Sequence, residues 1–190
     1  MRIGVAASGE GTNLRNLVDR GFDVVAVATN RPTCGAAAFA RARGIPLGEL
    51  PQKAFGSVEQ RDIAMRAFFL QHGVELVVDA GYDRIHSIPF LEAFENRIIN
   101  VHPSLLPEFA GGMDAIAQAL ASGAARTGAT VHVVTAELDA GPILLQETVP
   151  ILPGDTADTL RARVHEVEHR ILPEGIRIME ARLANRASVR

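Results

Sequence analysis

Buried apolar runs alternate with helical patterns over the first hundred residues, and this alternation constrains the fold more than any other feature. Four runs read as strands covered on both faces, because they are almost continuously apolar: residues 2–8, 23–30, 75–81 and 97–101. Amphipathic helical patterns separate them. Parallel strands need such crossovers, so the pattern predicts βαβ units and a mostly parallel, Rossmann-like α/β sheet with helices on both faces. A short strand is also expected at IPL, residues 45–47.

The pattern changes after about residue 115. The segment TGATVHVVT (127–135) alternates in polarity, and GPILLQETVPI (141–151) is predicted to be its hairpin partner. These two strands would form an antiparallel C-terminal extension of the sheet. Asp155 or Thr156 can cap a last helix, which Pro173 should break or kink.

Size and charge favour one globular domain over residues 1–190. Apolar residues make up 47% and charged residues 22% of the chain, and the net charge of −3 offers no electrostatic reason to expect a nucleic acid or membrane partner. The single cysteine, Cys34, excludes an internal disulfide. Together with the absence of a secretory leader, it predicts a cytoplasmic protein.

The loop SGEGTNL (8–14) lies between a predicted strand and a predicted helix. The backbone amides of Gly11, Thr12 and Asn13 would point out of a helix N-terminus, which suits one phosphate group. A tight turn with a helix cap explains the same residues. A dinucleotide site is less favoured, because Leu14 replaces the third glycine of its fingerprint.

HEVEH, at residues 165–169, matches the zinc-binding pattern H-E-x-x-H. His165 and His169 would share one helix face, and Glu166 could serve as the base of a zinc hydrolase. Only Glu174 and Glu180 follow as candidate third ligands. A polar helix face explains the motif equally well, and no metal is expected.

A third candidate site combines NVHPSLLP (100–107) with the loop ELDAGP (137–142). Asn100 and His102 end a predicted parallel strand, at the sheet edge where ligands bind in such folds. If Asp139 reaches His102, the three side chains could stabilise an oxyanion and move a proton. The alternative is that they satisfy backbone groups at a strand end and in an Asx-turn.

Taken together, several stretches resemble the family of folate-dependent phosphoribosylglycinamide formyltransferases. They are SGEGTNL, AGYDRI, NVHPSLLP, TGATVHVVTAELDAGPILLQETVPI, GDTADTL and RVHEVEHRILP, in this order and spacing. The resemblance covers nearly the whole chain. It implies transfer of a formyl group from 10-formyltetrahydrofolate, as co-substrate, to the primary amine of glycinamide ribonucleotide. It also implies small-molecule substrates only, a monomer or homodimer, and no metal.

The resemblance implies a role for each matching residue. Residues 1–100 would form the half that binds the phosphate and acceptor, and residues 101–190 the catalytic and folate-binding half. The catalytic residues would be Asn100, His102 and Asp139. The acceptor-binding residues would be Gly11, Thr12, Asn13, Pro103 and Glu168. The folate-binding residues would be Asp83, Arg84, Ile85, His86 and Asn100.

The chain also departs from the family's pattern. Asp83 stands where an apolar residue is common, so its folate contact is expected through the backbone. Val58 replaces an arginine that meets the folate tail in some relatives, and Arg61 could substitute for it. Residues 108–116 carry an apparent one-residue insertion near the acceptor. The alternatives are a formyltransferase for another amine, a 10-formyltetrahydrofolate deformylase, a zinc hydrolase and a non-catalytic mononucleotide-binding module.

Overall fold

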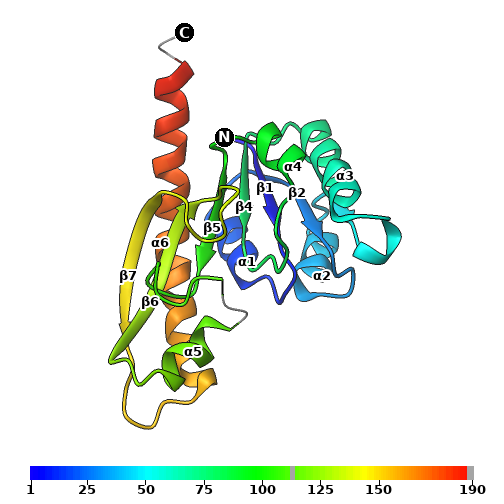
Figure 1. Cartoon of the computed structure of the whole chain (residues 1–190). Coiled ribbons are helices and arrows are strands. Elements are labelled where there is room, and N and C mark those ends of the chain that lie inside the picture. Colours follow the sequence, from blue (N-terminus) through cyan, green and yellow to red (C-terminus); the bar gives the residue numbers. More distant parts are fainter. Residues whose placement is uncertain (112–113, 188–190) are drawn as a thin grey trace. The chain divides into compact units, whose positions relative to one another are not determined.

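The computed structural model describes residues 1–111 and 114–187 (Figure 1). The chain forms two compact units, Met1–Ile99 and Asn100–Arg190. The fold class expected from the sequence is confirmed: parallel strands form the first unit, and an antiparallel pair follows near the C-terminus.

The sheet of the first unit has the strand order β3-β2-β1-β4, and every pairing in it is parallel. Its strands are β1 (Ile3–Ala6), β2 (Val24–Thr29), β3 (Leu47–Glu49) and β4 (Leu76–Asp79). All four residues of β1 and of β4 are buried, as continuous apolar runs predict for strands covered on both faces. β3 begins two residues later than predicted. Pro46 lacks the N–H that a ladder position uses, although its carbonyl accepts from the amide of Val27.

Helices cover both faces of this sheet. They are α1 (Thr12–Asp19), α2 (Gly35–Ala42), α3 (Val58–Gln71) and α4 (Ile88–Ala93), with a short 3-10 turn η1 (Gln52–Ala54). The chain runs outward from β1 through β2 to β3 and then returns across the sheet to β4. Right-handed crossovers therefore place α1 and α2 on one face and α3 on the other. In agreement, α1 contacts α2, whereas α3 contacts α4.

The second unit is built around a β-hairpin and a long helix. β5 (Ile98–His102) leads into it and is followed by α5 (Ala115–Ala121), β6 (Arg126–Val133), β7 (Ile143–Pro150) and α6 (Ala157–Ala187). β6 and β7 pair antiparallel, which confirms the predicted hairpin. α6 packs on both strands through buried apolar side chains such as Leu160, Val164 and Leu172.

Pro173 does not break the last helix, so a helix break there, one of the two outcomes expected from the sequence, is not found. α6 is helical throughout its 31 residues and contains Pro173 in its interior (Figure 1). The proline removes one helical hydrogen bond. Ile171, Leu172 and Ile176 are nevertheless buried on either side of it, so tertiary packing outweighs the local preference. The predicted cap is present, because the Thr156 hydroxyl accepts from the amide of Thr159 at 3.2 Å.

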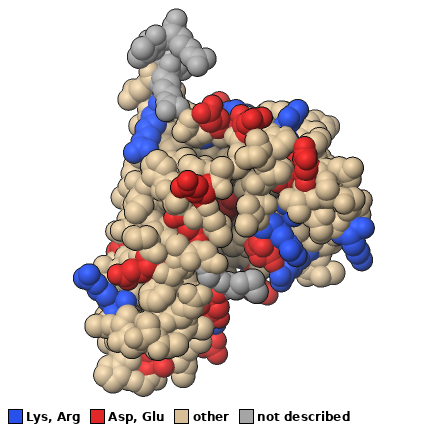
Figure 2. All heavy atoms as spheres, viewed as in Figure 1, with Lys and Arg blue, Asp and Glu red and all other residues tan. Residues whose placement is uncertain are grey.

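The surface carries both signs of charge. On the face shown in Figure 2, acidic and basic side chains of the described residues are interspersed rather than gathered by sign. Among the described residues, no helix is both long enough and apolar enough to cross a membrane.

Candidate active site

The end of β5 presents two of the expected catalytic side chains. Asn100 and His102 are two residues apart on an extended strand, so their side chains leave the same face. His102 is buried and Asn100 is half-buried. Pro103 follows and ends the strand, because it has no N–H to continue the ladder.

Asp139 lies in the loop between β6 and β7 and faces His102. Its Oδ2 atom is 3.6 Å from Nδ1 of His102, slightly farther than a hydrogen bond. The same oxygen accepts a hydrogen bond from the amide of Gly111 at 2.9 Å. Asp139 adopts a left-handed backbone conformation, with φ of 52°, which a short polar side chain tolerates. The structure therefore brings together the three residues that the sequence singled out.

His132 is a fourth member of this cluster, and it was missed in the sequence. It lies on β6 and is almost completely buried. Its Nε2 atom is 3.2 Å from Nδ2 of Asn100 and 3.7 Å from Oδ1 of Asp139, while its Nδ1 atom is 3.2 Å from the carbonyl of Val133. In the tautomer with the proton on Nδ1, Nε2 accepts from the Asn100 carboxamide. His132 thus holds Asn100 and contacts Asp139 at once.

The pKa of His102 is lowered from its ordinary value. Burial is the largest cause, because it disfavours the imidazolium. Asp139 and a hydrogen bond to the backbone of Phe109 act in the opposite direction, but burial outweighs them. The imidazole is therefore mainly neutral near pH 7. Its Nε2 atom is buried without a hydrogen-bond partner among the described residues, and in the tautomer with the proton on Nδ1 this atom has an available lone pair.

The predicted phosphate loop begins helix α1. Gly11 is the N-cap residue in a left-handed conformation, with φ of 75°. A Cβ atom there would lie 2.7 Å from the Cα of Ala36, so glycine is required for the close approach to α2. No side chain of the described residues caps this helix end. The amides of Thr12 and Asn13 belong to its first turn, the position of an anion site.

The predicted folate segment, residues 83–86, shows two kinds of side chain. Arg84 and Ile85 are exposed, whereas His86 is buried. His86 Nε2 lies 2.9 Å from Oδ2 of Asp79, and its ring stacks between Tyr82 and Phe90. A ligand contact of His86 would therefore involve its backbone. Burial raises the pKa of Tyr82 above its ordinary value, so this phenol stays protonated.

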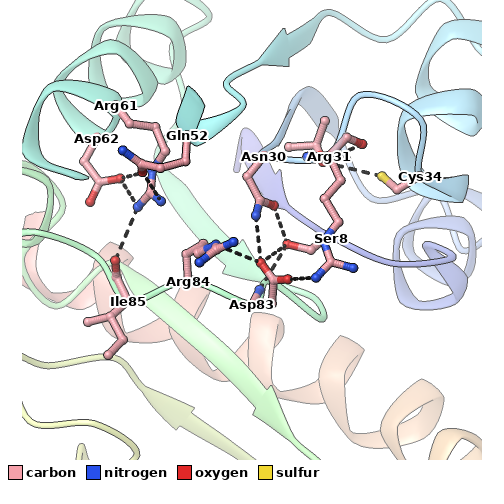
Figure 3. A network of polar contacts seen from close by, with 11 residues as sticks. Ser8, Asn30, Arg31, Cys34, Gln52, Arg61, Asp62, Asp83, Arg84 and Ile85 are labelled. Carbon is pink, nitrogen blue, oxygen red and sulfur yellow. Dashed lines mark hydrogen bonds and ion pairs between the residues drawn. The ribbon is translucent and has the colours of Figure 1, made fainter. Parts of the chain in front are cut away.

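Arg61 is not available as a substitute contact for a folate tail. Its side chain is 1% exposed and pairs with the equally buried Asp62 (Figure 3). It also donates to Gln52 and to the carbonyl of Ile85. Asp62 accepts from the amide of Ser87 at 2.6 Å. The pair thus anchors the segment after residue 84 to α3, and the suggestion drawn from the sequence is wrong.

The HEVEH motif lies on α6. The rings of His165 and His169 are stacked with their centroids 6.5 Å apart, and Glu168 is buried. Among the described residues, no three histidine, cysteine or acidic side chains are grouped so as to hold a metal ion. The zinc hydrolase interpretation therefore lacks a third ligand among the described residues.

The segment 108–116, which carries the apparent insertion, is described only in part, because residues 112–113 lie outside the described residues.

An α/β protein that gathers a carboxamide, two imidazoles and a carboxylate at a strand end has the groups of an enzyme that stabilises an oxyanion and moves a proton. The comparisons agree. A family profile described as formyl transferase matches residues 1–176. The chain belongs to the formyl transferase family.

Individual relatives are similar over most of the chain. A phosphoribosylglycinamide formyltransferase of Mycobacterium tuberculosis is 42% identical over 176 residues, which cover 90% of this chain and 81% of that protein. The crystal structure of glycinamide ribonucleotide transformylase 1 from Symbiobacterium toebii has a TM-score of 0.91 and 44% identity, and covers 96% of this chain and 89% of that chain. The chain spans only 18% of a trifunctional purine biosynthetic protein from Gallus gallus, with 38% identity.

Proposed function

We propose that this protein transfers a formyl group from 10-formyltetrahydrofolate to the primary amine of glycinamide ribonucleotide, a step of de novo purine synthesis. The observation that carries the proposal is the cluster of Asn100, His102 and Asp139 in a chain of the formyl transferase family. The names of the similar proteins support the choice of acceptor.

The chemistry follows from the protonation states in the cluster. The acceptor amine attacks the formyl carbon, the new C–N bond forms, and the carbonyl oxygen becomes an oxyanion. His102, neutral with an available Nε2 atom, would take the proton that the amine loses. The resulting imidazolium and the Asn100 carboxamide would then stabilise the oxyanion. Collapse breaks the bond to the folate nitrogen, which receives the proton, and Asp139 favours the charged imidazole during these steps.

The remaining residues would bind the two substrates. We assign the ribonucleotide phosphate to the amides of Gly11, Thr12 and Asn13. Pro103 would adjoin the acceptor site, and Glu168 would contact the acceptor. Residues 83–86 would line the folate pocket together with Asn100. In this proposal residues 1–190 act as one domain, with the acceptor-binding half before residue 101.

We also propose that the protein acts in the cytoplasm as a monomer or homodimer, on small-molecule substrates without a nucleic acid partner. The single cysteine and the mixed surface charge support this setting. Sedimentation of the purified protein would decide between the two oligomeric states.

One assay separates the proposed activity from its alternatives. The purified protein is mixed with 10-formyltetrahydrofolate in the presence of a chelator, and release of the deformylated folate is followed by absorbance. We expect release only when glycinamide ribonucleotide is added. Release without an acceptor would show a deformylase instead. Release restored only after zinc replaces the chelator would favour the HEVEH site.

A further inference from the structure

The carboxylate of Asp83 joins polar side chains that follow three neighbouring strands. Ser8 follows β1, Asn30 follows β2, and Asp83 lies beyond β4. Asp83 Oδ1 accepts from Asn30 Nδ2 at 2.8 Å and lies 3.0 Å from the hydroxyl of Ser8, whose oxygen in turn accepts from the Asp83 amide at 3.0 Å (Figure 3). The Ser8 hydroxyl is also 2.6 Å from Oδ1 of Asn30. The three side chains therefore form a closed network.

Charges favour the ionised form of this carboxylate. Arg31 pairs with Oδ2 of Asp83, and Nε of Arg84 lies 3.5 Å from Oδ1. Burial alone would raise the pKa of Asp83, but the hydrogen bonds from Asn30 and Ser8 and the charges of both arginines hold it below its ordinary value. The arginines are exposed, so their ion pairs contribute little to stability. The hydrogen bonds to the buried Ser8 and Asn30 are the stronger part of the link.

The network connects the two segments assigned to the two substrates. Ser8 begins the loop that leads to Gly11, and Asp83 begins the folate segment 83–86. A backbone bond reinforces the connection, because the Ser8 amide donates to the carbonyl of Gly81 at 3.0 Å. Side-chain and backbone hydrogen bonds therefore link the two segments directly.

We propose that Asp83 is a positioning residue that couples the binding of the acceptor phosphate to the binding of the folate. This inference rests on the proposed function, because it uses the substrate assignments made there. A phosphate on residues 11–13 orders the loop after Ser8, and the hydrogen bonds to Asp83 then order the folate segment. The second ligand meets an ordered segment and binds more tightly, and by linkage the effect is reciprocal.

The test uses a pair of ligands that cannot react. Tetrahydrofolate carries no formyl group, so its ternary complex with glycinamide ribonucleotide is stable. Titration calorimetry gives the Kd of glycinamide ribonucleotide with and without saturating tetrahydrofolate. For the unmodified protein we expect tetrahydrofolate to lower this Kd about fivefold or more.

Variants separate coupling from a general effect on binding. Asp83→Ala removes the shared acceptor, and the ratio of the two Kd values should fall to about one. Asp83→Asn keeps an acceptor oxygen for Ser8 and Asn30, so it should retain most of the ratio. Glu49→Gln breaks an exposed ion pair with Arg41 elsewhere in the same unit and should leave the ratio unchanged. If Asp83→Ala does not fold, Ser8→Ala breaks the network from its other end and should abolish the ratio in the same way.

The outcomes distinguish this inference from the proposed function. One contrary result is that the unmodified protein binds both ligands while the Kd of glycinamide ribonucleotide stays the same with and without tetrahydrofolate. Another is that Asp83→Ala keeps the full ratio of the two Kd values. In either case Asp83 does not couple the sites, and only this inference fails. If the unmodified protein binds neither ligand, the proposed function fails and the inference with it.

Discussion

His102 and Asp139 face each other with Nδ1 and Oδ2 3.6 Å apart, and both side chains are largely buried. At this distance the carboxylate orients the imidazole and favours its charged form without sharing its proton. The opposite ring nitrogen of His102 is left for a substrate. The pair is thus suited to a histidine that is neutral at rest and becomes charged during a reaction.

Replacing either member of the pair should lower turnover much more than binding. We expect His102→Ala to reduce kcat about 100- to 1000-fold, as loss of an oxyanion donor does in well-studied enzymes. Asp139→Asn should also reduce kcat, because the imidazolium loses its partner. Steady-state kinetics with glycinamide ribonucleotide measures kcat, and calorimetry measures acceptor binding, which should persist. His72→Ala, which removes an imidazole at the end of α3, is the matched control and should be fully active.

His132 should matter through the orientation of Asn100 and Asp139. His132→Ala removes the 3.2 Å contact with Asn100, and misplacement of the carboxamide should lower kcat about 100-fold. His132→Gln keeps a group that can accept from Asn100 and should recover part of the loss. Near-normal kcat in His132→Ala would show that Asn100 is held by other contacts.

The lowered pKa of His102 predicts a direction for the pH profile. If the neutral imidazole is the base, kcat/KM should be constant near pH 7 and should fall as the pH drops through a value below about 6.5. Because Asp139 acts to raise the pKa of His102, Asp139→Asn should lower that pKa further. The fall of kcat/KM at acid pH should therefore move to lower pH in Asp139→Asn. Steady-state kinetics and an NMR titration of the His102 imidazole can follow this shift. A shift to higher pH in Asp139→Asn would contradict this assignment.

Local patterns were sufficient to predict most of the fold. The buried strands and the hairpin depend on hydrophobic periodicity, which the sequence displays directly. The sequence did not show that the helix continues through Pro173, because the burial of Leu172 and Ile176, which holds the helix together, is a tertiary effect. The late start of β3 similarly depends on how Pro46 meets β2.

The site was only partly predictable from the sequence. Asn100, His102 and Asp139 stand in short motifs with recognisable chemistry, and the structure brings them together. His132 has no such context: in TGATVHVVT it is one polar residue in an alternating strand. The sequence feature that could have pointed to His132 is a polar side chain at a position that is buried in β6. The burial of Arg61 was equally hard to predict. Its ion-pair partner, Asp62, directly follows it in the sequence, and adjacent residues on a helix do not normally face each other.

The buried pair of Arg61 and Asp62 should be important for stability. Asp62 Oδ1 accepts from Nε of Arg61 at 2.9 Å and from Nη2 at 2.6 Å, and Oδ2 accepts from the amide of Ser87. Asp62→Ala leaves a guanidinium buried without its counter-charge. The free energy of unfolding, measured by urea denaturation, should fall by about 3–5 kcal/mol.

The double variant separates the uncompensated charge from the loss of the pair itself. Adding Arg61→Met to Asp62→Ala removes the buried charge while it keeps much of the side-chain volume, so stability should recover relative to the single variant. Glu49→Ala is the matched control: its ion pair with Arg41 is exposed, and its loss should cost less than about 1 kcal/mol. An equal loss in Asp62→Ala and Glu49→Ala would mean that burial of the Arg61 charge does not decide the cost. A double variant as unstable as Asp62→Ala would instead place the cost in the bonds that Arg61 and Asp62 make to Ile85 and Ser87.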